Sequence, residues 1–297
     1  MRKNFWFQLC LLLFFIVGGF TIFGSLAALL QLVLKLDTTS RTYFYMVQFI
    51  SALGIFFCPA MLFSYCTSQK WFSYSAANQK VSLPLVGYVL ILSLLILPVV
   101  VCLEYFNEQL SLPESLKKIE MWMQKMEENG KFVTQTLTAH STIPILLVNL
   151  LLMAFLPAIF EEFFFRGTLQ SFFVKWFGNK AVAIILTAFI FSAIHFQFYG
   201  FLPRFLLGIY LGYLLIWGKS LWLPITAHLT HNAASLILDY VAQQKKIDLE
   251  AVKPEDISGF YPVVLASLVC VGIGIYWIRK RYLCTSLTNF STSNTPP

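Results

Sequence analysis

Long uncharged runs of apolar residues recur along the chain and indicate its class. No Asp, Glu, Lys or Arg occurs from Asn4 to Leu34, and the same holds for four further stretches, at 42–69, 81–103, 181–203 and 257–278. Each run exceeds the roughly 20 apolar residues that a helix needs to cross a bilayer. Helices are expected throughout, because lipid offers no partner for open backbone groups and no run alternates like a barrel strand.

The pattern predicts an all-α polytopic membrane protein with about eight transmembrane helices in a single membrane domain, 1–297. The sixth segment is the shortest, since only Phe205 to Gly218 is free of charge there. The first uncharged run is longer than the apolar region of a signal peptide, so we expect it to be a retained helix. The expected spanning segments are 5–34, 43–67, 83–104, 143–170, 181–200, 203–218, 221–241 and 259–278.

The composition agrees with this interpretation. Of the 297 residues, 58% are hydrophobic and 12% are charged, about half the roughly 25% charge of soluble domains. We therefore exclude a cytosolic enzyme, a disordered regulator and a nucleic-acid-binding domain. The net charge of +7 fits loop Lys and Arg that face anionic headgroups. The six cysteines show no CxxC or CxxH spacing, so no thiolate zinc site or disulfide framework is expected.

The longest hydrophilic stretch, 106–142, is expected to be an extramembrane loop that contains an amphipathic helix. Ser111 and Glu114 have the spacing of a capping box, and Asn129-Gly130 is a stop signal. The helix is expected to lie on the membrane surface, packed on its own protein rather than acting as a dedicated substrate gate. Its apolar face consists of Leu116, Ile119, Met123 and Met126, with Trp122 beside them.

The two ends of the chain are expected on the same side of the membrane, because the number of helices is even. Arg2 and Lys3 at one end and the run 279–281 at the other favour the cytoplasm. Summed over all loops, however, Lys and Arg are equally numerous on the two sides. We expect a multi-pass protein of the bacterial inner membrane with cytoplasmic termini, a connector at 243–256 and a disordered tail at 282–297.

Ionisable residues interrupt the fourth segment, which reads PAIFEEFFFRG. Even the lowest scales assign about 2.5 to 3.5 kcal/mol to a charge at the centre of a membrane helix, so such residues usually face a polar interior and have a function. Glu162 and Arg166 are four residues apart, and an interfacial salt bridge is as good an interpretation of this pair as catalysis. Glu161 points roughly 100° away from Glu162 and lacks that partner.

Two later segments repeat this pattern. His195 lies in the otherwise apolar fifth segment with Phe191 one turn earlier, and the seventh segment places His228 and Asn232 four residues apart. Packing roles or interhelical hydrogen bonds are the alternatives. Polar groups on three helices satisfy one another only by converging, which favours a common intramembrane polar cavity.

The chemistry of such a cavity is narrow, because the sequence contains no GxSxG and no HExxH. A carboxylate and a histidine can deprotonate a water molecule, and a second histidine with a carboxamide can donate hydrogen bonds to an oxyanion. These groups suffice for peptide hydrolysis without a covalent intermediate. Alternatively, Glu161, His195 and His228 can hold a zinc ion, since catalytic zinc usually takes three such ligands. The cofactor is therefore either none or Zn.

The ordered motifs EExxxR (161–166), FxxxH (191–195) and HxxxN (228–232) resemble the signatures of the CPBP family, the CAAX-processing proteases and bacteriocin-processing or immunity-related (Abi) membrane proteins. The resemblance implies an intramembrane protease with its catalytic core at 143–241. It implies that Glu161 and His195 activate water and that His228 and Asn232 stabilise the oxyanion. The supporting residues it implies are Glu162, Arg166 and Phe191; His231 is an additional histidine.

The resemblance also implies a membrane-associated peptide or a lipidated protein as the substrate, and both metalloprotease and metal-free glutamate mechanisms fit the motif residues. A non-catalytic membrane scaffold or immunity protein that binds a partner is the alternative function. A transporter is a third possibility, but the first half of the chain contains no convincing copy of 161–232.

Overall fold

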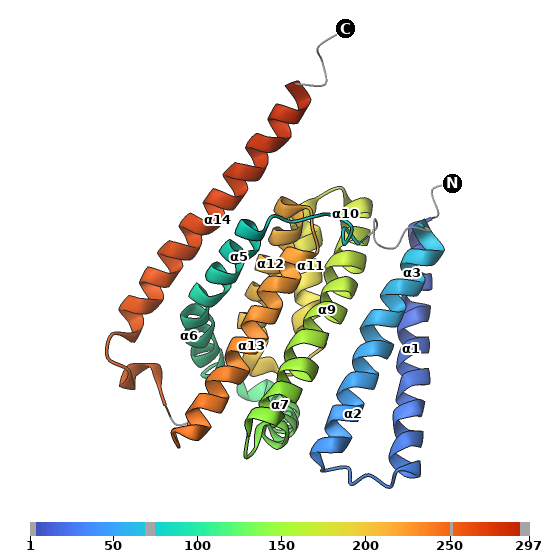
Figure 1. The fold of residues 1–297 in the computed structure, drawn as a ribbon. Helices are drawn as coiled ribbons and strands as arrows, with labels where there is room; N and C mark the ends of the chain where they lie inside the picture. Colours follow the sequence, from blue (N-terminus) through green and yellow to red (C-terminus); the bar gives the residue numbers. More distant parts are fainter. Residues whose placement is uncertain (1–3, 69–74, 250–251, 292–297) are drawn as a thin grey trace.

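The computed structural model describes residues 4–68, 75–249 and 252–291 (Figure 1), and every regular element in these ranges is helical. The predicted all-α fold class is confirmed. Among the short elements, η1, η3 and η4 are π-helical, and η2, η5 and η6 are 3₁₀ turns.

In chain order the elements are α1 (Phe5–Val33), α2 (Arg41–Ala52), η1 (Leu53–Phe57), α3 (Cys58–Ser68), α5 (Leu83–Leu95), α6 (Leu97–Glu108), η2 (Glu114–Leu116), α7 (Lys117–Thr138), α8 (Ile143–Asn149), η3 (Leu150–Phe155), α9 (Leu156–Glu162), η4 (Phe163–Gln170), α10 (Ser171–Phe177), α11 (Lys180–Ala193), η5 (Phe198–Gly200), α12 (Phe201–Gly218), α13 (Trp222–Gln244), η6 (Pro254–Asp256) and α14 (Phe260–Ser291).

Within the described ranges, six helices are long and apolar enough to cross a membrane, as expected of a polytopic membrane protein. Two of the eight predicted segments fall outside this set. The seventh forms α13, which has sufficient length, but polar residues such as His228 and Asn232 interrupt its apolar sequence. The fifth forms α11, an apolar helix of only 14 residues. The six are Phe5–Val33, Arg41–Thr67, Leu83–Glu108, Ile143–Phe177, Phe198–Gly218 and Phe260–Lys280.

The fifth predicted segment, 181–200, was too long. α11 ends at Ala193, and Phe196 adopts a left-handed φ of 53° that helps to reverse the chain before α12. His195 therefore lies in a turn just beyond a helix, and not inside one as we expected. The turn residues are as apolar as the helices beside them, so hydropathy alone does not mark the reversal.

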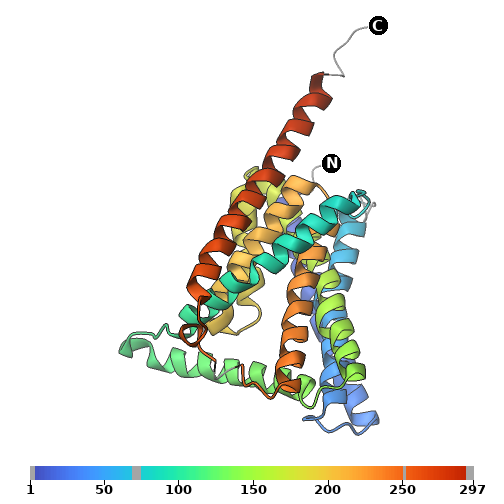
Figure 2. The same cartoon turned by 60° about the vertical axis from the view of Figure 1, so that its left-hand side comes forward.

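The spanning helices form a bundle whose centre contains α9, α11, α12 and α13 (Figure 1). α1, α2 and α3 form a layer on one side of this centre, and α14 lies on the other side. Both ends of the described chain lie at the same end of the bundle. Figure 2 shows α7 lying across the opposite end.

The predicted amphipathic helix exists, but both of its predicted ends were wrong. α7 begins at Lys117 with no side-chain cap, and it continues through Asn129-Gly130 to Thr138. The glycine serves close packing rather than termination, because a Cβ at Gly130 would lie 2.3 Å from the side-chain nitrogen of Gln197. The last turn of α7 is held by Asn149, whose Nδ2 donates to the carbonyl of Leu137 at 3.0 Å.

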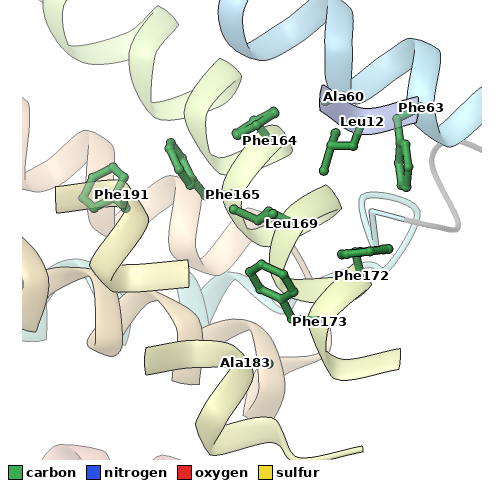
Figure 3. Close-up of a cluster of buried hydrophobic side chains, with 10 residues drawn as sticks. All are labelled: Leu12, Ala60, Phe63, Phe164, Phe165, Leu169, Phe172, Phe173, Ala183 and Phe191. Carbon is green, nitrogen blue, oxygen red and sulfur yellow. The ribbon is translucent and has the colours of Figure 1, made fainter. Parts of the chain in front are cut away.

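An aromatic core packs the fourth span against its neighbours (Figure 3). Phe165 is fully buried, and its ring stands nearly perpendicular to that of Phe191 at 5.0 Å between centroids. Phe191 is thus the side chain through which the core reaches the polar residues of α9 and α13. The cluster contains Leu12, Ala60, Phe63, Phe164, Phe165, Leu169, Phe172, Phe173, Ala183 and Phe191.

The last helix is longer than its apolar run. α14 continues to Ser291 and so includes 282–291, which we had expected to belong to a disordered tail. No Gly or Pro occurs between Ile278 and Ser291 to end the helix. The rest of the predicted tail, 292–297, lies outside the described residues.

Candidate active site

The charged pair of the fourth span is buried at the centre of the protein. The side chains of Glu162 and Arg166 are both 0% exposed, and Arg166 Nη1 donates to Glu162 Oε1 at 2.6 Å. The Arg166 guanidinium also lies 4.7 Å from the centroid of the Phe191 ring, in cation–π contact. The pair is therefore enclosed by protein and is not an exposed salt bridge on a helix surface.

Two glycines of α12 complete the surroundings of this pair. Arg166 Nη2 donates to the carbonyl of Gly208 at 3.2 Å, and Gln170 Nε2 donates to that of Gly212 at 3.1 Å. A Cβ at Gly208 would lie 3.1 Å from the Cα of Ala188, so the close approach of α12 and α11 requires a residue without a side chain. The donors Arg166 and Gln170 are four residues apart, and they bind the carbonyls of two glycines that are also four residues apart.

The backbone that carries Arg166 is π-helical, a widening that is frequent at functional sites. Side chains bridge its wider turns: Thr168 Oγ1 donates to the Phe163 carbonyl and Ser171 Oγ to the Arg166 carbonyl, each at 3.1 Å and each across five residues. Hydroxyl groups thus supply donors to carbonyls in the widened turns.

His228 of α13 connects the two glutamates of α9. Its Nδ1 lies 2.8 Å from Glu162 Oε1, and its Nε2 lies 3.9 Å from Glu161 Oε2. Because an ionised carboxylate only accepts hydrogen bonds, Nδ1 is the donor to Glu162. Glu162 therefore fixes the ring so that Nε2 faces Glu161, whose side chain is 13% exposed.

His195 is oriented by a backbone carbonyl. Its Nδ1 lies 2.7 Å from the oxygen of Phe191, and because a carbonyl only accepts, Nδ1 carries the hydrogen. In the neutral imidazole this leaves Nε2 as a proton acceptor. The Phe191 ring stands edge-to-face against both His195, at 5.2 Å, and His228, at 5.8 Å.

Asn232 and His231 follow His228 on α13. Asn232 Nδ2 makes one long hydrogen bond, 3.5 Å, to the carbonyl of Met153. His231 Nδ1 is buried, and no hydrogen-bond partner is found for it within the described part of the chain. The hydroxyl of Ser235 donates to the His231 carbonyl at 3.2 Å, and the hydroxyl of Ser192 donates to the Phe201 carbonyl at 2.7 Å.

These residues line a cavity of about 870 Å³. The side chains of Glu161, His195, His228 and Asn232, predicted from three separate segments, all contribute to its wall, as does Phe191. Glu162 and Arg166 do not line the cavity and instead support it from behind. The remaining lining residues belong to α2, α5, α6, α7, η3, α9, α12 and α13 and to the turn at 197–200.

The cavity also contains polar residues that the sequence analysis missed. Glu104 and Arg204 line its wall together with Gln197. The two charged residues border the uncharged runs 81–103 and 181–203, at the ends of the predicted segments 83–104 and 203–218, and the sequence analysis did not consider them as site residues. Their position immediately next to an apolar run was the only available signal.

The zinc alternative was tested against the arrangement of donor groups. Among the described residues, no group of three or more His, Cys, Asp or Glu side chains is arranged to hold a metal ion. Glu161, His195 and His228 share the cavity without forming such a set. The described donor groups therefore do not fit a three-ligand metal site.

The helical bundle and its buried polar cavity define a multi-pass membrane protein with a candidate intramembrane active site. A comparison with protein families matches residues 143–234 to the family described as Type II CAAX prenyl endopeptidase Rce1-like. The matched stretch contains all three motifs, and the match is consistent with the CPBP family of CAAX-processing proteases. No curated protein and no solved structure matches the chain.

Proposed function

We propose that the protein is an intramembrane endopeptidase that hydrolyses a peptide bond of a membrane-associated substrate by means of activated water. The observation that carries the proposal is the presence of Glu161, His195, His228 and Asn232 in the wall of one cavity inside the bundle. The Rce1-like match over 143–234 supports the same class of reaction.

In the proposed reaction, Glu161 and His195 accept the proton of a water molecule whose oxygen attacks the carbonyl carbon of the scissile bond. The carbonyl oxygen becomes an oxyanion. When the carbon–nitrogen bond breaks, the proton passes to the leaving nitrogen, so that the products are a carboxylate and an amine. Glu161 is available for this task because its described contact to His228 Nε2 is long, at 3.9 Å.

The developing oxyanion is assigned to His228 and Asn232. Donation from His228 Nε2 requires that both ring nitrogens carry hydrogens, and Glu162 Oε1 already accepts from Nδ1 at 2.8 Å. Asn232 Nδ2 makes a single described hydrogen bond, which is long at 3.5 Å, so this donor can bind the oxyanion at the loss of only one weak contact. Preorganised donors in a site shielded from water are among the largest contributions to catalysis.

The test uses protein purified in detergent and a panel of membrane-anchored peptides, prenylated and unprenylated. Glu161→Ala and Glu161→Gln should abolish cleavage, whereas Ser235→Ala, a change in the wall of the same cavity, should retain it. Full activity of a Glu161 variant would overturn the proposal. If folded, inserted Glu161→Gln and His195→Ala variants keep the cellular phenotype, a scaffold or immunity role is supported instead.

For the cellular location we keep the expectation of a bacterial inner membrane with cytoplasmic termini. The common placement of both chain ends at one end of the bundle supports termini on one side of the membrane. Under this proposal α7 lies on the opposite, periplasmic side (Figure 2). Accessibility of a cysteine placed at Lys117, measured in intact cells, tests the assignment.

A further inference from the structure

The turn that carries His195 has few hydrogen bonds of its own. Beyond α11, its described backbone–backbone hydrogen bonds are short-range, such as that from the amide of Phe196 to the carbonyl of Ala193 at 3.2 Å. Phe196 has a φ of 53°, a conformation that costs energy for a residue other than glycine and persists only where the surroundings enforce it. Besides the Phe191 carbonyl that binds its Nδ1, the position of His195 therefore depends on side chains that bind the turn.

Three side chains donate to carbonyls in this turn or at the start of α12. Ser192 binds the carbonyl of Phe201 and Arg204 binds that of Gln197, but both donors belong to the α11–α12 hairpin itself. Asn107 is different, because it lies at the end of α6. Its buried side-chain amide donates to the carbonyl of Phe198 at 2.9 Å and also to that of Tyr199.

A second contact reaches the same turn from α7. The indole ring of Trp122 packs against Phe198 at 5.3 Å and against Phe196 at 6.4 Å between ring centroids. The amide of Asn107 and the ring of Trp122 thus hold the same short segment, Phe196 to Tyr199, which directly follows His195.

We propose that Asn107 is a positioning residue for His195: its carboxamide holds the carbonyls of Phe198 and Tyr199 and thereby fixes the imidazole in the cavity. The inference rests on the proposed function, in which His195 shares the activation of water. A misplacement of a reacting group by about 1 Å can cost about 100-fold in rate, although the shifted residue never touches the substrate.

The variant Asn107→Ala should lower kcat by about 10- to 100-fold and leave KM within about twofold. Asn107→Asp should behave in the same way, because an ionised carboxylate keeps the shape of the side chain but cannot donate. Gln109→Ala is the matched control: its exposed amide lies two residues further along and donates to the carbonyl of Tyr105, four residues earlier in the chain. This control should retain the parental kcat.

A double-mutant cycle separates positioning from general destabilisation. In the background of His195→Gln, adding Asn107→Ala should lower the residual kcat no further, because the group to be positioned is gone. Equal losses in both backgrounds would overturn the inference. An unchanged kcat in folded Asn107→Ala would overturn it as well.

A readout independent of turnover is the imidazole nitrogen NMR spectrum of the protein in detergent. The chain has four histidines, so His195 can be assigned by comparison with His195→Gln. Asn107→Ala should shift or broaden the His195 signals, and Gln109→Ala should not; unchanged His195 signals would refute the positioning role. Cleavage by Glu161→Gln would show that the proposed function is wrong. The NMR spectrum tests the positioning of His195 independently of that result, because it does not depend on turnover.

If Asn107→Ala does not fold, Trp122→Leu replaces it in the double-mutant cycle and in the NMR experiment. Trp122→Phe is then the conservative variant. Trp122 is 44% exposed, so its replacement spares the core. Trp122→Leu should disturb His195 and lower kcat, and Trp122→Phe should restore both. Normal His195 signals in Trp122→Leu would count against the inference.

Discussion

His228 Nδ1 lies 2.8 Å from Glu162 Oε1, the same oxygen that accepts from Arg166 Nη1 at 2.6 Å. A single carboxylate thus neutralises a buried guanidinium and orients the imidazole that faces Glu161. It does so from behind the cavity wall. The second glutamate of the EExxxR motif is thereby a structural support for the first.

Glu162→Gln should therefore destabilise the protein. The variant leaves Arg166 as an uncompensated buried charge, for which about 3 to 5 kcal/mol is expected. Glu108→Gln is the control, because its pair with Lys131 at 3.7 Å is nearly half exposed and contributes about 0 to 1 kcal/mol. Thermal unfolding in detergent should show a large decrease in Tm for the first variant only. Similar Tm values for the two would contradict the support role.

Gly208→Ala should also destabilise the protein, because the added methyl group meets the Cα of Ala188 at 3.1 Å. Overpacking of this kind typically costs about 1 to 3 kcal/mol. Gly87→Ala, in the middle of α5, meets nothing within 4 Å and should be neutral or stabilise the helix by up to about 1 kcal/mol. Opposite shifts of Tm would support the packing described for α12. A stabilising Gly208→Ala would refute it.

Asn232→Ala should act on catalysis and hardly on stability. Its side chain makes one long hydrogen bond of 3.5 Å in the described structure, so little folding energy is lost. Removal of an oxyanion donor costs about 100- to 1,000-fold in kcat. Steady-state kinetics on a cleaved peptide should show this loss with KM nearly unchanged, while Ser235→Ala behaves like the parent. A pure increase in KM would instead assign Asn232 to substrate binding.

Chelation should leave the activity unchanged, because the described His, Cys, Asp and Glu residues do not group into a metal-binding set. The measurement is the rate of peptide cleavage before and after dialysis against a chelator, together with metal analysis of the active sample. A loss of activity that zinc restores would establish the metal-dependent alternative and require the three residues to rearrange.

The positions of the site residues were predictable from the sequence because the membrane simplifies the problem. Polar side chains such as Glu161, His195 and Asn232 are costly in lipid, so their presence on separate segments indicated that they meet. The structure brings them into one cavity wall. Their catalytic roles remain predictions.

The remaining features depend on contacts that the pattern of a single chain does not contain. The hydrogen bond of Glu162 to His228 joins residues 66 positions apart. Gly130 has the sequence context of a helix stop, but it lies inside α7, where it packs closely against the side chain of Gln197. Likewise, the turn after Ala193 is as apolar as its flanks, so nothing in the hydropathy placed His195 outside a helix.

The paired bonds from Arg166 to Gly208 and from Gln170 to Gly212 also limit how the protein can move. A slip of α12 by one turn would bring Ile216 or Arg204 into a space that holds only a glycine. The two bonds and the close approach at the two glycines therefore permit a single register of η4 against α12. Any widening of the cavity that admits a substrate must therefore leave the register of η4 against α12 unchanged.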